Sequence, residues 1–266
     1  MNSAVLLKRV GLHTRIDPLT GVAGHDAHGG MSAADRCALE LATQTGQEVL
    51  AVAAGPDSAQ EVLREALAAG ATSAVWVDLP ADAGSLQVAR AVAPEIAGHQ
   101  LVWAGAHSLD RGSGSVPAFL AGLLGWAQAL GLVAVTVGDP LRVSRRLDAG
   151  RRELLRVTAP AVLSVEAGVV TPRRPTLQAV LNSGRAAIRV VAGPRQEVNL
   201  GRPVPFRPRP KVLPGPDPSL PARDRLVALS GALRAHEGPR FVRADPEQAA
   251  DELLMYLRAS GGGKSA

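Results

Sequence analysis

The first half of the chain alternates short apolar segments with longer segments in which apolar residues recur every three or four positions. The apolar segments predict strands buried on both faces, at residues 4–7, 49–53, 74–77 and 101–104. The longer segments predict amphipathic helices at residues 33–44, 59–69, 86–96 and about 116–130. This alternation predicts an α/β fold with a doubly wound, mostly parallel sheet, whose ligands bind at the carboxyl ends of the strands.

Local signals mark some of the helix boundaries in this half. Ser32 immediately precedes the first predicted helix, where its hydroxyl can cap the free N–H groups of the first turn. Gly70 follows the second helix and supplies the permissive backbone that commonly ends one. Within that helix, Leu63 and Leu67 are predicted to face the core.

After Gly131 the pattern changes to consecutive strands. Strands are predicted at residues 132–137, 141–147, 153–157 and 161–165. Turn residues occupy 138–140 and 148–150, and the second of these turns is typical of a hairpin. An irregular segment from 170 to 187 follows, with a short helical piece at 177–181.

Prolines dominate the next part of the chain. Between residues 193 and 221 they occur at almost every third position, which predicts an extended arm instead of a packed element. Two helices are predicted beyond it, at about 222–235 and 246–259. We therefore divide the chain into an α/β domain at residues 1–192 and a Pro-rich arm with C-terminal helices at 193–266, which we expect to contact a partner subunit.

Composition narrows the class of protein. The 266 residues carry 29 basic and 24 acidic side chains, a formal charge of +5, and arginine supplies nearly all of the positive charge. Only 3% of residues are aromatic, too few for the base-stacking platforms of nucleic-acid-binding proteins. Cys37 is the single cysteine, so an intramolecular disulfide is excluded and a reducing, cytoplasmic setting is expected. No apolar run is long enough to span a membrane, so we expect a soluble protein without membrane insertion.

The loop after the strand at 101–104 carries the clearest candidate chemistry. It places glycines and serines immediately before a helix, where backbone N–H groups and the helix N-terminus can bind a phosphate. Neither the GxxxxGK[ST] nor the GxGxxG pattern is present. On the pattern alone, a Gly/Ser turn that caps a core helix remains an equal alternative.

Six segments, in their order and spacing, resemble the beta subunit of electron transfer flavoproteins. They include VLLKRV at 5–10, RIDPLTG at 15–21 and MSAADRCALELA at 31–42. The others are residues 53–77, LDRGSGSVPAFLAGLLGW at 109–126, and residues 160–185. Each piece is common by itself, and the combination is what makes the resemblance specific.

The resemblance implies a Rossmann-like sheet of the adenine-nucleotide hydrolase type and a permanent heterodimer with an alpha subunit. It implies that FAD is held mainly by the alpha subunit, and that the beta subunit binds AMP or, in electron-bifurcating members, a second FAD. Electrons would pass from a flavin-dependent dehydrogenase to an acceptor. The resemblance therefore implies an electron carrier without catalytic residues, not an enzyme.

The residues that the resemblance implies in nucleotide binding come from strand ends, one helix start and the Gly/Ser loop. They are Leu6, Ser32, Ala54, Gly55, Gly105, Asp110, Arg111, Gly112, Ser113, Gly114, Ser115 and Val116. The chain departs from the family at the helix start and in the loop. Ser32-Ala33-Ala34 stands where the family has Asn-Pro-Phe/Tyr. In the loop, Arg111 or Gly112 stands where the family has an acidic residue after Asp110, and Ser113 and Ser115 stand where it has Thr and Gln.

The segment at 160–185 resembles the part of the family that docks on dehydrogenases. Leu177 resembles a leucine that family members insert into a dehydrogenase pocket, and local packing beneath the loop is the alternative. Arg173 and Arg174 beside it are expected to steer an acidic partner surface.

Two other classes of protein remain as alternatives. One is a non-redox nucleotide-binding module of the universal-stress-protein type. The other is an adenylating or ATP-hydrolysing enzyme, which would need an SGGxDS-type loop after the first strand, where this chain has KRVGLHTRID. No metal site is expected, because His25-x-x-His28 has no acidic or cysteine companions at ligand spacing.

Overall fold

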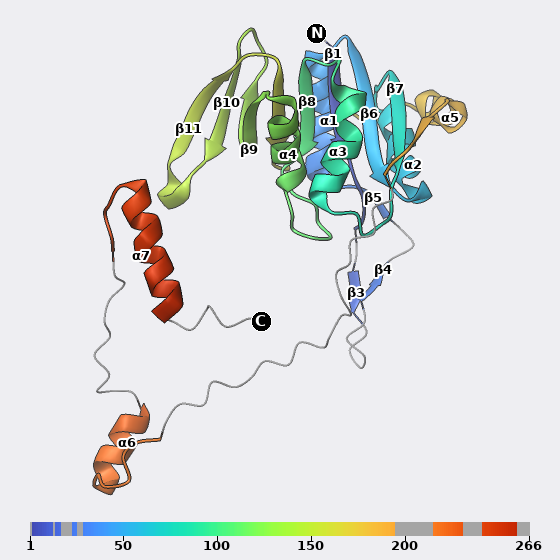
Figure 1. Cartoon of the computed structure of the whole chain (residues 1–266). Helices are drawn as coiled ribbons and strands as arrows, with labels where there is room; N and C mark the ends of the chain where they lie inside the picture. The colour runs from blue at the N-terminus through green and yellow to red at the C-terminus, as the bar shows by residue number, and fades with distance from the viewer. Residues whose placement is uncertain are drawn as a thin grey trace. The chain divides into compact units, whose positions relative to one another are not determined.

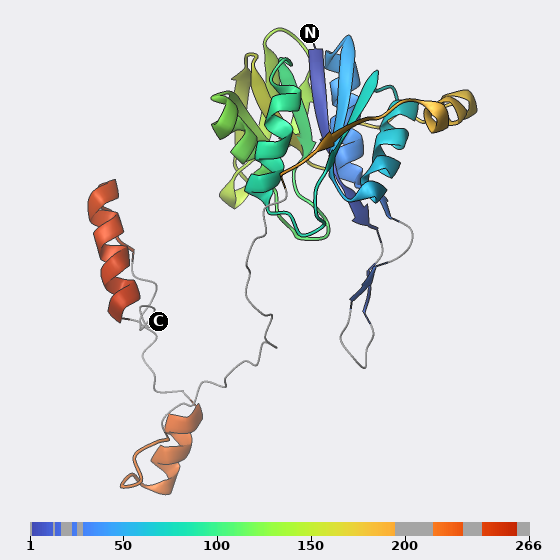
Figure 2. The ribbon, with the colours of Figure 1, turned by 45° about the vertical axis from the view of Figure 1, so that its right-hand side comes forward.

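The computed structural model describes residues 2–12, 14–16, 23–25, 29–194, 215–230 and 241–259. The chain forms two compact units, Met1–Leu200 and Gly201–Ala266. The first contains a large sheet with helices on both faces (Figures 1 and 2). The described residues of the second form the helices α6 (Ala222–Ser230) and α7 (Pro246–Ala259).

The sheet of the first unit has nine strands in the order β11-β10-β9-β12-β8-β1-β6-β7-β13. All neighbours from β9 to β13 along this order run parallel, and β9-β10-β11 are antiparallel. The predicted doubly wound, mostly parallel sheet is therefore confirmed. The strands are β1 (Asn2–Leu7), β6 (Glu48–Gly55), β7 (Ser73–Asp78), β8 (Leu101–Gly105), β9 (Ala127–Thr136), β10 (Leu141–Arg146), β11 (Arg152–Val157), β12 (Ala161–Val165) and β13 (Arg189–Ala192).

Helices cover both faces of this sheet, which explains why its central strands are apolar throughout. In Figure 1, α3 (Ser85–Ile96) and α4 (Ser115–Leu124) lie in front of the sheet and α1 (Ala33–Thr45) lies behind it. Alternate residues of β8 enter different cores. Trp103 packs in the cluster that contains the α1 residues, and Val102 packs in the cluster that contains the α3 and α4 residues. The second helix behind the sheet, α2 (Gln60–Ala68), adds Leu63 to the first cluster.

The connections leave β1 in opposite directions. From β1 the chain passes through α1 to β6 on one side, whereas β8 pairs with β1 on its other side. The loops after β1 and β8 therefore diverge at their carboxyl ends, which is where doubly wound sheets form a ligand crevice. This point of divergence positions the candidate site.

The fourth helix is shorter than predicted. It ends at Leu124 and not near residue 130, because Gly125 adopts a left-handed conformation with φ of 66° and caps it. Residues 127–136 form β9, which pairs with β12 and β10. The predicted helix was wrong over residues 127–130, because pairing with other strands decided the conformation of an apolar segment that fits either element.

Two further predictions and one unpredicted strand can be compared with the structure. The helical piece at 177–181 extends to the end of α5 (Leu177–Arg185), and β13 was not predicted. β13 is an edge strand of four mostly exposed residues, so it lacks the buried apolar run by which strands were predicted. The hairpin turn at 148–150 is confirmed, because β10 and β11 pair across it.

Some expected elements lie partly outside the described residues. The RIDPLTG hairpin is represented by β3 (Thr14–Ile16) and β4 (Ala23–His25), which pair antiparallel. Residues 195–214 of the Pro-rich arm and residues 231–235 of the predicted helix at 222–235 lie outside the described part of the chain. The short strands β2 (Arg9–Gly11) and β5 (Gly29–Met31) pair near the start of α1.

Candidate functional site

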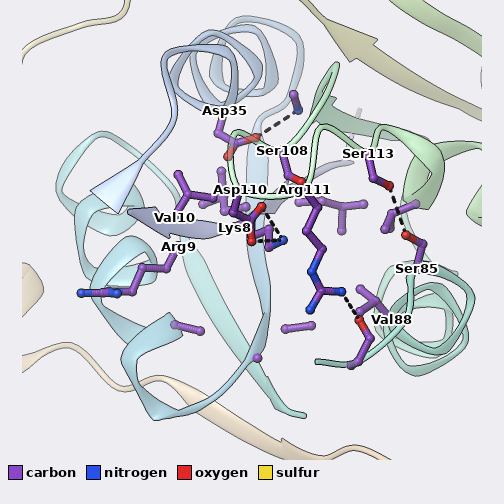
Figure 3. A pocket seen from close by; sticks show the side chains of 18 of the residues that line it. Lys8, Arg9, Val10, Asp35, Ser85, Val88, Ser108, Asp110, Arg111 and Ser113 are labelled. Carbon is purple, nitrogen blue, oxygen red and sulfur yellow. Dashed lines mark hydrogen bonds and ion pairs between the residues drawn. The ribbon is translucent and has the colours of Figure 1, made fainter. Parts of the chain in front are cut away.

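A cavity of about 390 Å³ opens at the carboxyl ends of β1, β6 and β8, within the size range of small-molecule sites (Figure 3). Its walls are largely apolar, with β1 and β6 residues on one side and the segment around α3 on the other. The apolar lining includes Leu6, Val52, Ala54, Leu79 and Val88. This lining suits a flat, weakly polar ring.

A lysine and an aspartate from distant parts of the chain meet inside the cavity. Lys8, directly after β1, donates to both carboxylate oxygens of Asp110, at 2.8 and 2.7 Å. Burial alone would raise the pKa of Asp110, but the hydrogen bonds from Lys8 and Ser108 bring that pKa below its usual value. The Asp110 carboxyl is therefore ionised at neutral pH, and its ion pair with Lys8 lies in the cavity.

Arg111 forms a strap between two loops at the cavity. Its guanidinium donates to the carbonyl oxygens of Ala81, at 2.7 Å, and Ala83, at 3.0 Å, in the segment before α3. Figure 3 shows the side chain extending across from the β8–α4 loop to that segment. Arg111 thus ties together the two loops that face each other across the ligand crevice.

The start of α4 is open and rich in hydroxyls. Ser85, Ser113 and Ser115 form a chain of hydroxyl contacts, with 3.3 Å between the first two oxygens and 3.1 Å between the last two. Gly114 is the N-cap residue of α4 and makes no side-chain cap hydrogen bond. The free N–H groups of this first turn, with the partial positive charge of the helix end, are suited to an anionic group.

Asp35, in the first turn of α1, is a buried carboxyl group beneath the cavity. Its Oδ1 accepts a hydrogen bond from the Gly105 N–H at 3.2 Å, and Figure 3 shows this contact between α1 and the end of β8. Burial raises the pKa of Asp35 from 3.8 to about 6, although hydrogen bonds and the charge of Lys8 act in the opposite direction. No side chain fits at position 105, because a Cβ there would collide with the Asp35 carboxylate.

Asp35→Asn is expected to stabilise the chain at neutral pH. The folded state binds the Asp35 proton more tightly than the unfolded state, so wild-type stability falls as pH rises from about 4 to about 6. Above that window the ionised carboxylate imposes a cost of at most about 3 kcal/mol, which asparagine avoids. The amide oxygen of asparagine keeps the hydrogen bond from one of the two backbone donors, Gly105 and Lys8, so we expect a net gain smaller than this limit. Denaturant unfolding across this pH range measures the difference, which we expect to vanish near pH 4.

Lys8, directly after β1, is the charged group that acts on Asp35, and His107 and Asp110 of the β8–α4 loop line the same cavity. Lys8→Met separates the contribution of the Lys8 charge from that of burial. An Asn variant whose advantage is the same at about pH 4 and about pH 8 would contradict the assignment to Asp35.

Comparison with known proteins places this fold and cavity in a family. The model of the electron transfer flavoprotein domain matches residues 20–195, well over half of the chain. The chain belongs to the electron transfer flavoprotein beta-subunit family. The predicted family resemblance is thus confirmed.

Individual relatives agree with this assignment. The chain is 35% identical over 152 residues to the electron transfer flavoprotein subunit beta of Mus musculus and 37% identical over 152 residues to that of Homo sapiens. These alignments cover 54% of this chain and 59% of each relative, so the chain spans about three fifths of the length of these relatives. The subunit beta of Chromohalobacter salexigens is 28% identical over 250 residues, which cover 90% of this chain and 92% of the relative.

Most of the nucleotide residues that the family resemblance implies line the cavity. These are Leu6, Ala54, Gly55, Gly105, Asp110, Arg111, Ser113, Gly114 and Val116. Three do not. Ser32 is buried and accepts from the Asp35 N–H as the N-cap of α1, which confirms its capping role. Gly112 shapes the loop with φ of 62°, and Ser115 contacts the cavity residue Ser113.

Sequence reasoning missed several cavity residues. Lys8, Asp35 and Ser85 each come from a different segment than the Gly/Ser loop, and only the fold brings them to it. Lys8 directly follows a predicted strand, at the end where ligands bind, and this position was an available signal. Asp35 had a weaker signal, as an acidic residue in the first turn of a predicted helix.

Leu177, in the segment that resembles the family's docking region, lies apart from the cavity, on α5. Leu177 is 76% exposed, and Val180 and Leu181 at helical spacing are also exposed. Thr176 caps this helix by accepting from the Ala179 N–H. This exposed apolar helix face is consistent with the expected docking role of Leu177. The exposure of Leu177 does not fit the alternative, in which its side chain packs beneath a loop.

Two arginines hold α5 in place. Arg173 binds the buried Glu40 of α1 through its side chain, at 2.8 and 3.0 Å, and through its backbone N–H at 3.1 Å. These hydrogen bonds lower the pKa of Glu40 from 4.5 to about 2. Arg64 of α2 donates to carbonyl oxygens at the end of α5, the shortest contact being 2.8 Å to Ser183. The charge of Arg173 is therefore matched inside the chain, whereas Arg174 is exposed.

Two other features of the described residues bear on the site. Cys37 is buried, and its thiol donates to the Val170 carbonyl oxygen at 3.3 Å. Within the described part of the chain, no three metal-ligating side chains gather at one place, and no helix is both long and apolar enough to cross a bilayer.

Proposed function

We propose that this chain is the beta-type subunit of a heterodimeric electron transfer flavoprotein, and that its cavity holds an adenine nucleotide, AMP. The observation that carries the proposal is the cavity at the diverging ends of β1 and β8, in a chain of this family. Apolar walls and an open helix N-terminus meet there, as an adenylate requires.

The donor set of the cavity fits an adenylate. The walls formed by Leu6, Val52 and Val88 suit the adenine ring. At the other end, the N–H groups at the start of α4 and the Ser113 hydroxyl suit the phosphate. Lys8 supplies positive charge nearby, although Asp110 balances it. A second FAD at the same cavity would use the same residues for its AMP half.

In this proposal the alpha subunit holds most of the redox FAD, and this chain supports it as a non-catalytic electron carrier subunit. When bound, that flavin takes up electrons from a flavin-dependent dehydrogenase and passes them to an acceptor. In this role the residues that line the cavity bind and orient the nucleotide. A reducing cytoplasm suits a subunit whose one cysteine is buried.

The second unit supports the proposed heterodimer. Its helix α7 exposes a run of large apolar side chains, Leu253, Leu254, Met255, Tyr256 and Leu257, all at least 46% exposed. Such a surface is typical of a segment that binds another protein. We propose that residues 193–266 bind the alpha subunit and that α5 docks on the dehydrogenase through Leu177.

Co-expression with the alpha-type subunit tests the proposal. We expect a yellow, equimolar complex that releases AMP on denaturation, identified by mass spectrometry. The chain expressed by itself is expected to carry no redox-active flavin. A colourless complex, a complex without nucleotide, or a single chain that binds ATP in strong preference to AMP in calorimetry would each contradict it.

A further inference from the structure

The antiparallel strands β10 and β11 place four arginines on one face of the sheet. Their register sets Arg142 opposite Arg156, and Arg146 opposite Arg152. Between the two pairs, Leu154 lies opposite Ser144. All four arginines are exposed, and Leu154 is 82% exposed. We call these five residues, Arg142, Arg146, Arg152, Leu154 and Arg156, the arginine face.

This arrangement is unfavourable for the chain by itself. Like charges directly opposite each other on neighbouring strands repel. An exposed leucine also contributes no free energy of apolar burial to folding. None of the four arginines forms an ion pair with the described residues. The other face of the same two strands is conventional, because Arg145 pairs there with Glu153 and Val143 is buried in the core.

The five residues of the arginine face are exposed within the described part of the first unit, whereas Ser144, between Arg142 and Arg146 on β10, is buried. Helix α4 packs against β9 and β12, whereas the principal neighbours of β10 and β11 are strands. Figure 1 shows these two strands extending at the edge of the sheet beyond α4. Arginines around an exposed apolar residue are typical of the centre of a protein interface.

We propose that the arginine face binds an acidic surface of the alpha-type subunit. This inference rests on the proposed heterodimer and adds the chemistry of its interface. Guanidinium groups bind carboxylates through paired hydrogen bonds, so aspartates and glutamates on the partner would neutralise both arginine pairs. An apolar partner residue would cover Leu154.

The position of the arginine face favours the alpha subunit over the dehydrogenase as its occupant. It lies at the β11 edge of the sheet, whereas α5 packs against α2 and the chain then enters β13 at the opposite edge. Figure 1 shows β11 and α5 at opposite sides of the first unit. A permanent subunit can therefore occupy the arginine face while the docking helix α5 stays free for a transient partner.

Arg156→Glu tests the proposal because it changes two measurements in opposite directions. In the free chain the new carboxylate lies opposite Arg142 and replaces a repulsion with an attraction, so we expect a higher melting temperature. Against the alpha-type subunit it introduces a like charge, so we expect heterodimer Kd to rise by about tenfold or more at low salt. We also expect the Kd of this variant to depend less on salt than that of the wild type.

Arg90→Glu is the matched control, since Arg90 is exposed on α3 and forms no ion pair with described residues. Equal effects of Arg156→Glu and Arg90→Glu on heterodimer Kd would overturn the arginine-face proposal and leave the proposed function intact. Failure of the wild-type chain to bind the alpha-type subunit would overturn both. Binding of random-sequence duplex DNA by the wild type, lost in Arg156→Glu with heterodimer Kd unchanged, would assign the face to nucleic acid instead.

Discussion

Gly114→Ala is expected to lower the AMP content of the purified heterodimer. A Cβ at position 114 would lie under 3.0 Å from the carbonyl oxygen of Ala106, closer than real Cβ atoms come to a neighbour. That carbonyl cannot retreat easily, because the Ala106 N–H is tied to the Val165 carbonyl oxygen of β12 at 2.9 Å. The loop must therefore shift, which moves Ser113 and the start of α4 away from the cavity. We expect a loss of roughly 1–3 kcal/mol in stability and a fall of at least about tenfold in AMP affinity.

Gly122→Ala is the matched control for this prediction. Gly122 lies in α4 with open space around its Cα, so alanine there should leave binding unchanged and stabilise the helix by about 0.5–1 kcal/mol. AMP per heterodimer, measured by mass spectrometry after denaturation, and melting temperature are the two readouts. A Gly114→Ala heterodimer with a full complement of AMP would show that this loop does not hold the nucleotide.

Leu177→Ala is expected to slow electron transfer from the dehydrogenase by about tenfold in kcat/KM, the effect of one buried apolar anchor at an interface. Leu177 is 76% exposed, so truncation removes little from the free chain and its stability should not fall. The cavity does not include Leu177, so flavin and AMP contents should also be unchanged. Stopped-flow reduction of the heterodimer by its dehydrogenase measures the effect.

Leu123→Ala provides the comparison, because Leu123 is an exposed leucine on α4, away from α5. We expect its kcat/KM to equal that of the wild type. If Leu177→Ala reduces as fast as Leu123→Ala, α5 is not the docking segment, and another surface must meet the dehydrogenase.

The central sheet could be predicted from sequence because its strands are buried on both faces and separated by capped, amphipathic helices. The ends of α4 and β9 could not, since residues 127–130 are apolar enough for either element and only pairing with β12 decides between them. β13 was not predicted for the opposite reason, because an exposed edge strand has no buried apolar run that sequence analysis could detect.

The candidate site likewise contains residues that the sequence predicted and residues that only the fold reveals. Its Gly/Ser loop was visible as a local pattern, and Gly114 and Ser113 do line the cavity. Lys8 and Asp35 were invisible as members of the same site, because their neighbours in space lie 102 and 70 residues away along the chain. The like-charged pairs of the arginine face were equally hidden, since they exist only through the register of β10 and β11.

The strap formed by Arg111 has a consequence for how fast a bound nucleotide exchanges. Two hydrogen bonds to the segment before α3 hold the walls of the crevice together, so we expect a ligand to leave more slowly while both are intact. A nucleotide enclosed in this way leaves slowly and acts as a built-in part of the folded subunit. Its occupancy would then be set during assembly and would not follow changes in the surrounding AMP concentration.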